Sequence, residues 1–290
     1  MNINLEKIKS SKSTEELLKF SIINIDKPLG STSFQVSQFV KNLLGVNKTS
    51  HLGTLDPTIV SGVLPIALGR ACRLSEYLMH RDKTYVGIMR LHREIKKEDL
   101  EKVIKEFIGK IKQLPPKRSR VKRAIREREV KSFKILEIDG KDILFETEVQ
   151  AGTYIRKICD DIGKIIGGAH MLELRRTKAG FFTEDKIYTL YQLDKAVEDY
   201  KKRSDFALRD MLVPGEVISQ ILPVININKQ VLKKCLAGSP IFLNFILKEE
   251  EIKNLEKDEK ITVFCEESFV GCYKFIGSSS IIAVPEFVYN

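Results

Sequence analysis

Apolar and polar positions alternate along some segments of the chain and follow helical spacing along others. Residues 21–30, SIINIDKPLG, alternate as a strand does and end at a Pro-Leu-Gly turn. Residues 33–44 carry apolar side chains at helical spacing, with a Ser/Thr run ahead of them as N-cap and Gly45 as C-cap. The same patterns predict further helices at 14–20, 97–107, 153–166, 194–212 and 228–238, and a short helix that ends near 79.

Strands are predicted between these helices and again near the C-terminus. The Asp139-Gly140 pair predicts a hairpin between two of them. Many short strands with Gly, Asn and Asp turns follow a boundary near Pro214-Gly215 and are typical of a small β-barrel. The sequence therefore predicts an α+β fold: a mixed, mostly antiparallel sheet flanked by helices, followed by a small C-terminal β-barrel. The predicted strands are 84–92, 129–140, 141–150, 169–182, 222–227, 239–244, 259–266, 268–277 and 280–288.

The chain of 290 residues carries a formal net charge of +10, unevenly distributed. Residues 110–134 contain 11 lysines and arginines against two glutamates, a net charge of +9, whereas residues 213–290 have a net charge of −2. Concentrated basicity indicates a polyanionic partner, most simply nucleic acid. A solvated, charged loop is the alternative. Aromatic residues are not interleaved with the basic run. The run is therefore expected to bind phosphates and not to recognise bases.

Other features of the composition exclude several classes of protein. No stretch approaches the roughly 20 apolar residues that span a membrane, and the N-terminus is too charged for a signal peptide. The five cysteines form no CxxC pair and are interpreted as reduced thiols. The four histidines lack metal-ligand spacing, so we expect no metal and no cofactor. We therefore expect an intracellular, cytoplasmic protein that does not bind membranes.

Asp56 is the most conspicuous candidate for chemistry. It lies between Leu55 and Pro57, ahead of the apolar run of residues 63–68. This pattern predicts a tight turn that presents one carboxylate at the edge of a buried strand or helix. An Asp-Pro turn whose carboxylate caps a neighbouring amide explains the spacing equally simply. Spacing alone favours that structural interpretation.

Several separate segments together resemble the pseudouridine synthases of the tRNA T-loop type. They are residues 27–33 (KPLGSTS), the Asp56 segment, residues 83–85 (KTY), residues 152–156 (GTYIR) and residues 169–180 (AHMLELRRTKAG). GVNKTSHLGTLDP, LPPKRSRVKRAIR and AGTYIRKICDDIG are similar to the archaeal and eukaryotic branch, the dyskerin-like catalytic subunits of H/ACA guide-RNA particles. The C-terminal barrel is similar to a PUA domain.

The resemblance implies a domain organisation. Residues 1–20 would form an N-terminal arm, 21–212 the catalytic domain and 213–290 a PUA-like RNA-binding domain. In some relatives such an arm packs on the C-terminal domain, and the sequence leaves open whether this one does.

The resemblance also implies the catalytic residues. Pseudouridine formation breaks the N1–C1′ bond of uridine, turns the uracil and rejoins it through C5. An ionised carboxylate can serve as nucleophile or stabilise positive charge on the ribose, without a cofactor. Asp56 occupies that position, and Arg156 occupies that of the guanidinium that keeps the carboxylate charged. Tyr85 is expected to stack on the uracil and to assist proton movement, although a core aromatic on an apolar strand is the alternative.

Further residues are implied as substrate contacts. His51 corresponds to the family's histidine beside the flipped nucleotide, Leu174 to an apolar residue of the uracil pocket, and Tyr154 belongs to the GTYIR motif. A hydrogen-bonded structural histidine and an ordinary core leucine are the alternatives. The first motif, with Lys27 and Pro28, is expected to pack beneath the catalytic loop. Phosphate contacts are expected from Lys117, Arg118, Arg120, Lys122 and Arg123.

We therefore expect an RNA pseudouridine synthase acting on rRNA, tRNA or both. The expected partners are an H/ACA guide RNA, the substrate RNA and the small protein subunits of an H/ACA ribonucleoprotein. Two alternatives remain open: a stand-alone synthase for the tRNA T-loop, and a non-catalytic RNA-binding scaffold.

Overall fold

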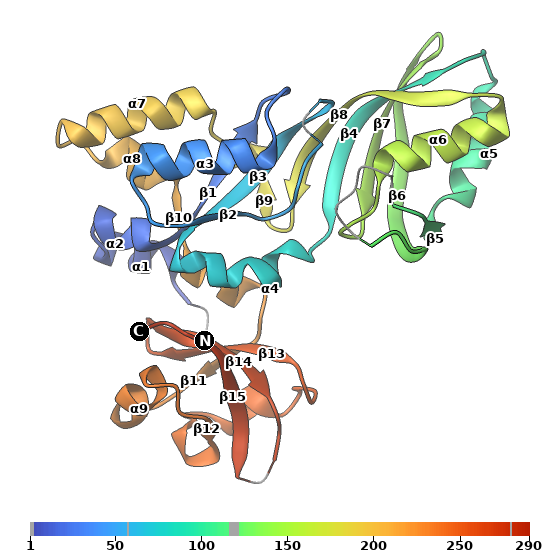
Figure 1. Cartoon of the computed structure of the whole chain (residues 1–290). Coiled ribbons are helices and arrows are strands. Elements are labelled where there is room, and N and C mark those ends of the chain that lie inside the picture. The colour runs from blue at the N-terminus through green and yellow to red at the C-terminus, as the bar shows by residue number, and fades with distance from the viewer. Residues whose placement is uncertain (1–2, 57, 116–121, 279) are drawn as a thin grey trace. The chain divides into compact units, whose positions relative to one another are not determined.

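Two compact units make up the chain in the computed structural model, which describes residues 3–56, 58–115, 122–278 and 280–290 (Figure 1). One unit comprises Met1–Ile22, Leu68–Leu74 and Leu212–Asn290, and the other comprises Ile23–Ala67 and Ser75–Met211. The α-helices are α1 (Leu5–Ser11), α2 (Thr14–Lys19), α3 (Ser33–Leu44), α4 (Ser75–Met79), α5 (Lys97–Glu106), α6 (Ile155–Ile166), α7 (Leu190–Lys201), α8 (Phe206–Met211) and α9 (Leu232–Leu236).

A ten-stranded sheet has the order β10-β1-β3-β8-β4-β7-β6-β5, with β2 beside β3 and β9 beside β8. β3 and β8 run parallel, whereas the pairs from β8 through β4, β7 and β6 to β5 are antiparallel, so the predicted mixed, mostly antiparallel sheet is confirmed. The strands of this sheet are β1 (Phe20–Lys27), β2 (Thr49–His51), β3 (Val60–Gly69), β4 (Lys83–Leu91), β5 (Gly109–Gln113), β6 (Arg126–Asp139), β7 (Asp142–Val149), β8 (Ala169–Ala179), β9 (Phe182–Thr183) and β10 (Leu212–Pro214).

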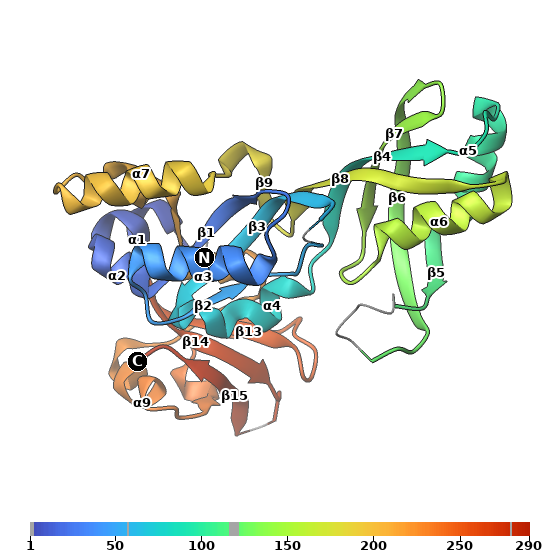
Figure 2. The same cartoon turned by 45° about the horizontal axis from the view of Figure 1, so that its top comes forward.

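Local sequence signals set the ends of the two helices nearest the Asp56 segment. Thr32 caps α3 through a reciprocal capping box with Gln35, and Gly45 ends the helix with a φ of 65°. Helix α6 buries four of its isoleucines, Ile155, Ile158, Ile162 and Ile166, and packs along β8 (Figure 2). The approach is close, because a Cβ on Gly163 would lie 2.4 Å from the backbone nitrogen of Ala169. These features confirm the helices predicted at 33–44 and 153–166.

Two helical predictions were incomplete. The single helix predicted over residues 194–212 is broken into α7 and α8, because Arg203 adopts a left-handed φ of 70° and Ser204 bonds back to the Asp199 carbonyl. Helix α7 also begins earlier, at a capping box formed by Thr189. Helix α1 was not predicted, and its N-cap is the side chain of Asn4.

The C-terminal residues form a curled five-stranded sheet with the order β11-β13-β14-β15-β12 (Figure 1). The predicted barrel is therefore present as a half-barrel. Its core includes Ile261, Val263 and Tyr273. Its strands are β11 (Val224–Asn226), β12 (Ile241–Phe242), β13 (Lys260–Cys265), β14 (Ser268–Phe275) and β15 (Ile281–Val288).

The first 20 residues belong to the same unit as this half-barrel. The Phe20 ring stacks on Tyr289 with ring centroids 4.3 Å apart and on Phe269 at 5.3 Å. Lys12 forms an ion pair with the buried carboxylate of Glu216. The arm and the C-terminal residues thus share an aromatic and ionic contact surface.

Substitution of Gly62 tests how closely the backbones of β3 and β8 pack. It has a φ of 96°, and a Cβ there would lie 2.3 Å from the Arg176 carbonyl oxygen. We expect Gly62→Ala to lower the free energy of unfolding by about 2 kcal/mol or more, through backbone strain and overpacking. Gly140→Ala is the control, since its φ is 55° but no atom lies within 4 Å, and it should cost about 1 kcal/mol. Equal losses in urea denaturation would contradict this explanation.

Candidate active site

The Asp56 turn joins β2 to β3 and is held from both sides. The buried Ser33 hydroxyl, at the start of α3, accepts a hydrogen bond from the Leu55 amide at 2.9 Å. The Leu52 amide donates to the Pro65 carbonyl at 2.8 Å, and the Val60 amide donates to the Asp56 carbonyl at 3.3 Å. With Leu52 and Leu55 buried, the backbone on either side of Asp56 is fixed while its side chain stays partly accessible.

The two oxygens of the Asp56 carboxylate have different partners. Oδ1 accepts from the Thr58 amide at 3.0 Å and from the Thr58 hydroxyl at 2.8 Å. Oδ2 forms a charged hydrogen bond of 3.0 Å with Nη2 of Arg156, which lies 100 residues away in the sequence. Both explanations from the sequence thus have a basis in the geometry: the carboxylate caps a local amide and also faces a remote guanidinium.

These contacts decide the charge of Asp56. Burial alone would raise its pKa, but the hydrogen bonds from Thr58 and the charges of Arg156 and Lys27 outweigh that effect. The pKa of Asp56 therefore lies below its ordinary value, and the side chain is a carboxylate at neutral pH. An anionic group beside a guanidinium suits reaction with an electron-poor carbon.

Lys27 lies under the turn and is fully buried. Its ammonium donates to the carbonyls of Pro28 at 2.8 Å and Val60 at 2.9 Å. Burial lowers the pKa of Lys27, while the charge of Asp56 opposes the shift. Lys27 thus links the end of β1 to the start of β3, and Pro28 is exposed in the turn that follows.

Arg176 on β8 is the largest fully buried side chain, and sequence analysis did not select it. Its guanidinium donates to the carbonyls of Val63 at 2.7 Å and Gly53 at 3.2 Å. Burial lowers the pKa of Arg176, and hydrogen bonding with Tyr85 opposes that shift. Tyr85 pairs with Arg176 in register across β4 and β8. Through Arg176, Tyr85 is therefore connected to the turn that carries Asp56.

Burial and the charge of Arg176 together lower the pKa values of two other basic side chains, His51 and Lys83. Burial and, after it, the charge of Arg176 lower the pKa of His51, so its imidazole is neutral at neutral pH. Within the described part of the chain, Nδ1 of His51 is buried without a hydrogen-bond partner. Burial and Arg176 also lower the pKa of Lys83 to about 8. The interior next to Asp56 is consequently rich in positive charge.

Tyr154 and Leu174 are held in different ways. The buried Gln113 side chain bonds to both the amide and the carbonyl of Tyr154, at 3.0 and 3.2 Å. This clamp fixes the N-terminus of α6, from which Arg156 projects. Leu174 is 5% exposed on β8, and its amide donates to the Ile59 carbonyl at 3.2 Å. Its methyl group lies against Gly87, two residues from Tyr85.

Of the predicted basic loop, Lys122 and Arg123 are exposed. Lys117, Arg118 and Arg120 lie outside the described residues.

Sequence reasoning missed Arg176, Ser33, Thr58 and Gln113. The strand pattern held a signal for Arg176, because successive residues of a strand face opposite sides and one arginine of the pair at 175–176 must point inward. Arg175 instead forms ion pairs with Asp26 and Glu184.

Neither a metal site nor a membrane span is found where the chain is described. In that part, no group of three or more His, Cys, Asp or Glu residues is arranged to hold a metal. None of the described helices combines the length and hydropathy needed to cross a membrane.

Comparison with known proteins identifies the family. Residues 41–155 match the model of the N-terminal domain of TruB family pseudouridylate synthase, and residues 156–219 match that of the C-terminal domain of tRNA pseudouridylate synthase B. The chain belongs to the TruB family. It is a pseudouridine synthase, an RNA isomerase, which confirms the family and the enzyme class expected from the sequence.

Relatives and solved structures of the TruB family agree with this result. Proteins named probable tRNA pseudouridine synthase B from Archaeoglobus fulgidus and Methanopyrus kandleri are each 42% identical over 252 residues, covering 86% of this chain and 77% and 74% of theirs. A chain in the crystal structure of a Cbf5-Nop10-Gar1 complex superposes with a TM-score of 0.88 at 34% identity, covering 97% of this chain and 88% of that one. A chain of an H/ACA RNP bound to a substrate RNA containing 2′-deoxyuridine gives 0.86 at 32% identity, with 97% and 89% covered.

Substitution of Thr58 tests what keeps the Asp56 carboxylate charged. Replacing Thr58 with Val removes the hydroxyl donor to Asp56, so the pKa of Asp56 should rise toward its ordinary value of about 3.8. Carbon-detected NMR titration of the Asp56 carboxyl group measures this change. Because the folded pKa is depressed, the stability contributed by Asp56 is present above pH 4 or so and is lost as the pH falls through the folded value. An unchanged pKa in Thr58→Val would contradict the assignment.

Proposed function

We propose that Asp56 is the catalytic carboxylate for the isomerisation of uridine to pseudouridine in structured RNA. Its Oδ2 would face ribose C1′ while the N1–C1′ bond breaks, either bonding to that carbon or stabilising its positive charge. The freed uracil turns, C5 bonds to C1′, the C5 proton leaves and N1 ends protonated. Every atom of the uridine is kept, so the reaction requires no cofactor.

The 3.0 Å contact between Asp56 and Arg156 is the observation that carries this proposal. It joins two motif residues 100 positions apart, and Thr58 holds the other carboxylate oxygen. When RNA covers the site, loss of water would raise the pKa of Asp56. The guanidinium opposes that rise and keeps the group anionic.

The remaining site residues would hold the extruded uridine. Flipping it out of an RNA structure costs a few kcal/mol, which contacts in the site must offset. We assign stacking on the uracil and help with removal of the C5 proton to Tyr85, and an apolar wall to Leu174. We place neutral His51 and Tyr154 beside the flipped nucleotide. Lys27 and Pro28 are given the structural role of supporting the turn.

The basic loop is assigned to phosphate binding. Lys122 and Arg123 are exposed, and Lys117, Arg118 and Arg120 lie in the same stretch of sequence. Such contacts strengthen binding to any sequence and make it depend on salt.

We infer that the chain works as the catalytic subunit of an H/ACA guide-RNA particle. The superposition over 97% of the chain on structures of a Cbf5-Nop10-Gar1 complex and of a substrate-bound H/ACA RNP supports this. The partners would then be a guide RNA, substrate rRNA or tRNA and small proteins like those in the complexes. Residues 213–290 would form a PUA-like RNA-binding domain and residues 1–20 an arm packed on it, in an intracellular enzyme.

A stand-alone tRNA synthase is the second candidate. The archaeal relatives, which are named probable tRNA pseudouridine synthase B, favour it. A non-catalytic scaffold, the third possibility that the sequence left open, is not supported, because the chain belongs to a family of pseudouridine synthases.

Substitution of Asp56 separates catalysis from binding. Asp56→Asn should reduce the single-turnover rate of pseudouridine formation by roughly 10⁴-fold or more, with RNA affinity within about threefold of wild type. Arg156→Ala should slow turnover by roughly tenfold to a thousandfold, again with a smaller effect on affinity. Asp160→Asn, an exposed carboxylate on α6, is the control and should be silent. Near-normal turnover by Asp56→Asn would show that Asp56 is not the catalytic carboxylate.

Guide dependence is decided by a reconstitution assay. The purified chain is incubated with a tRNA transcript, and separately with a guide RNA, partner proteins and a matching substrate. The guided function predicts at least about tenfold faster conversion of the guide-matched uridine in the complete particle. Activity on tRNA alone, with none in the particle, would establish the stand-alone function instead.

A further inference from the structure

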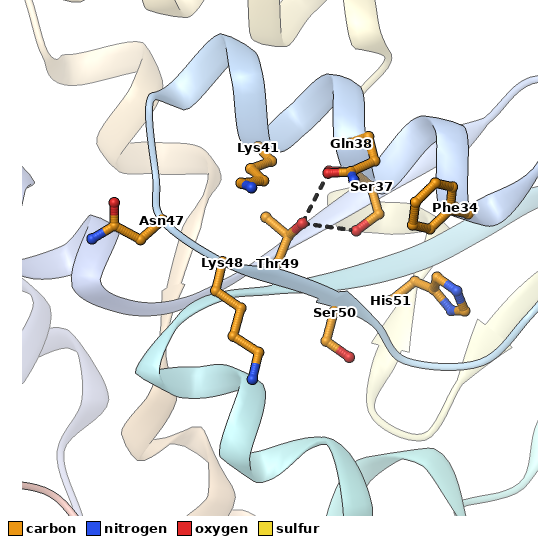
Figure 3. A pocket seen from close by; sticks show the side chains of 9 residues that line it. All are labelled: Phe34, Ser37, Gln38, Lys41, Asn47, Lys48, Thr49, Ser50 and His51. Carbon is orange, nitrogen blue, oxygen red and sulfur yellow. Dashed lines mark hydrogen bonds between the residues drawn. The ribbon is translucent and has the colours of Figure 1, made fainter.

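A hollow of about 270 Å³ lies beside His51, between α3 and the segment that leads into and forms β2 (Figure 3). None of the other proposed site residues that the structure describes lines it. Its size is just below the roughly 300–1,000 Å³ of sites that hold drug-sized ligands, which suits one nucleotide. The lining residues are Phe34, Ser37, Gln38, Lys41, Asn47, Lys48, Thr49, Ser50 and His51.

Hydrogen bonds hold the two sides of the hollow together. The buried Ser37 hydroxyl donates to the Thr49 hydroxyl at 3.0 Å, and the Thr49 hydroxyl donates to the Ser37 carbonyl at 3.1 Å (Figure 3). Ser50 is further bonded to Ser75 at 3.1 Å. The hollow is therefore formed by the fold before any ligand arrives.

The charge of the hollow is positive. Lys41 comes from α3 and Lys48 from the segment before β2, and both are basic members of the described lining. Between Lys27 and Leu55 the sequence contains no Asp or Glu. Among the residues that the structure describes, neither Lys41 nor Lys48 forms an ion pair. Two cations without local carboxylates suit the phosphates of a nucleic acid.

An aromatic ring stands at one end of the hollow. Phe34 is 62% exposed, although α3 buries Val36 and Val40, and it lies beside His51 (Figure 3). Stacking of a base on such a ring is favourable and independent of sequence.

His51 connects the hollow to the Asp56 turn. It precedes Asp56 by five residues, and the carbonyl of Gly53, two residues after it, accepts a hydrogen bond from the buried Arg176 at 3.2 Å. An RNA strand whose target uridine lies at Asp56 would pass His51 before it reaches Lys41 and Lys48.

We propose that this hollow binds an unpaired nucleotide adjacent to the target uridine, with its base stacked on Phe34 and its phosphates at Lys41 and Lys48. The proposal rests on the proposed RNA-modifying function. It adds a second anchor on the substrate, formed by α3 and β2, in a different part of the sequence from residues 117–123. An acidic peptide of a partner protein is the competing occupant. Among the described lining residues, Phe34 is the only large apolar side chain. A nucleotide is favoured because it can place its base on this ring and its phosphates at the two lysines.

The test uses the full chain with an RNA that it converts, alone or in the guide-RNA particle. Lys41→Gln/Lys48→Gln should reduce the slope of log affinity against log salt by about 1.4, or roughly 0.7 for each lost phosphate contact on a single strand. Phe34→Ala should weaken binding roughly tenfold and leave that slope unchanged. In both variants, the single-turnover rate at saturating RNA should stay within about twofold of wild type.

Matched controls are available on exposed helices of the same unit. Lys201→Gln/Lys202→Gln removes two exposed lysines near the end of α7, and Phe206→Ala removes a ring that is 82% exposed on α8. Both should leave affinity and salt slope unchanged. In addition, 4-thiouridine placed next to the target uridine should crosslink to the peptide that contains Phe34 or Lys48.

The outcomes separate the two proposals. If wild type converts uridine, Asp56→Asn does not, and the variants of the hollow keep normal affinity and salt slope, the hollow is not an RNA subsite. Normal substrate binding combined with loss of a partner protein would assign the hollow to a peptide and overturn the inference. If wild type converts no RNA in either format, the proposed function fails and the subsite fails with it.

Discussion

The fully buried guanidinium of Arg176 is the constraint on which the candidate active site depends. An unpaired charge in a protein interior is very costly unless polar groups surround it. Arg176 meets this condition through hydrogen bonds to the carbonyls of Gly53 and Val63, and Tyr85 lies opposite it across β4 and β8. The two carbonyls lie on either side of the Asp56 turn in the sequence. The need to provide hydrogen-bond partners for Arg176 therefore fixes the Asp56 turn and β3 next to β8, and Tyr85 on β4 lies opposite the arginine.

The same cation shapes the electrostatics around the turn. Its charge adds to burial in lowering the pKa values of His51 and Lys83, and Lys27 supplies a further buried ammonium. Asp56 is thus a carboxylate at the edge of a positive interior, with Arg156 at its accessible side. In the proposed site, this arrangement would keep the carboxylate charged when RNA displaces water. It would also attract the phosphates of the substrate.

The candidate site is held by separate parts of the chain. Ser33 fixes the Asp56 turn from α3, and Gln113 fixes the N-terminus of α6 that carries Arg156. The acid and its guanidinium partner are consequently supported by different elements, and no local segment contains both. The hollow next to His51 has a similar construction, since Ser37 and Thr49 join a helix to a strand. In this unit, hydroxyl and amide side chains hold the loops on which the charged groups are displayed.

The sequence by itself determined the features that depend on neighbouring residues. Capping at Thr32 and Gly45, the turn at Asp139-Gly140 and the isoleucine spacing of α6 required only local geometry and hydrophobic periodicity. The sequence motifs also predicted that Asp56 and Arg156 belong to the same active site. Tertiary structure alone decided their 3.0 Å contact, the inward direction of Arg176 rather than Arg175, and the hollow beside His51. Alternation along a strand shows that consecutive side chains face opposite sides, but which side is the interior depends on the elements that pack against it.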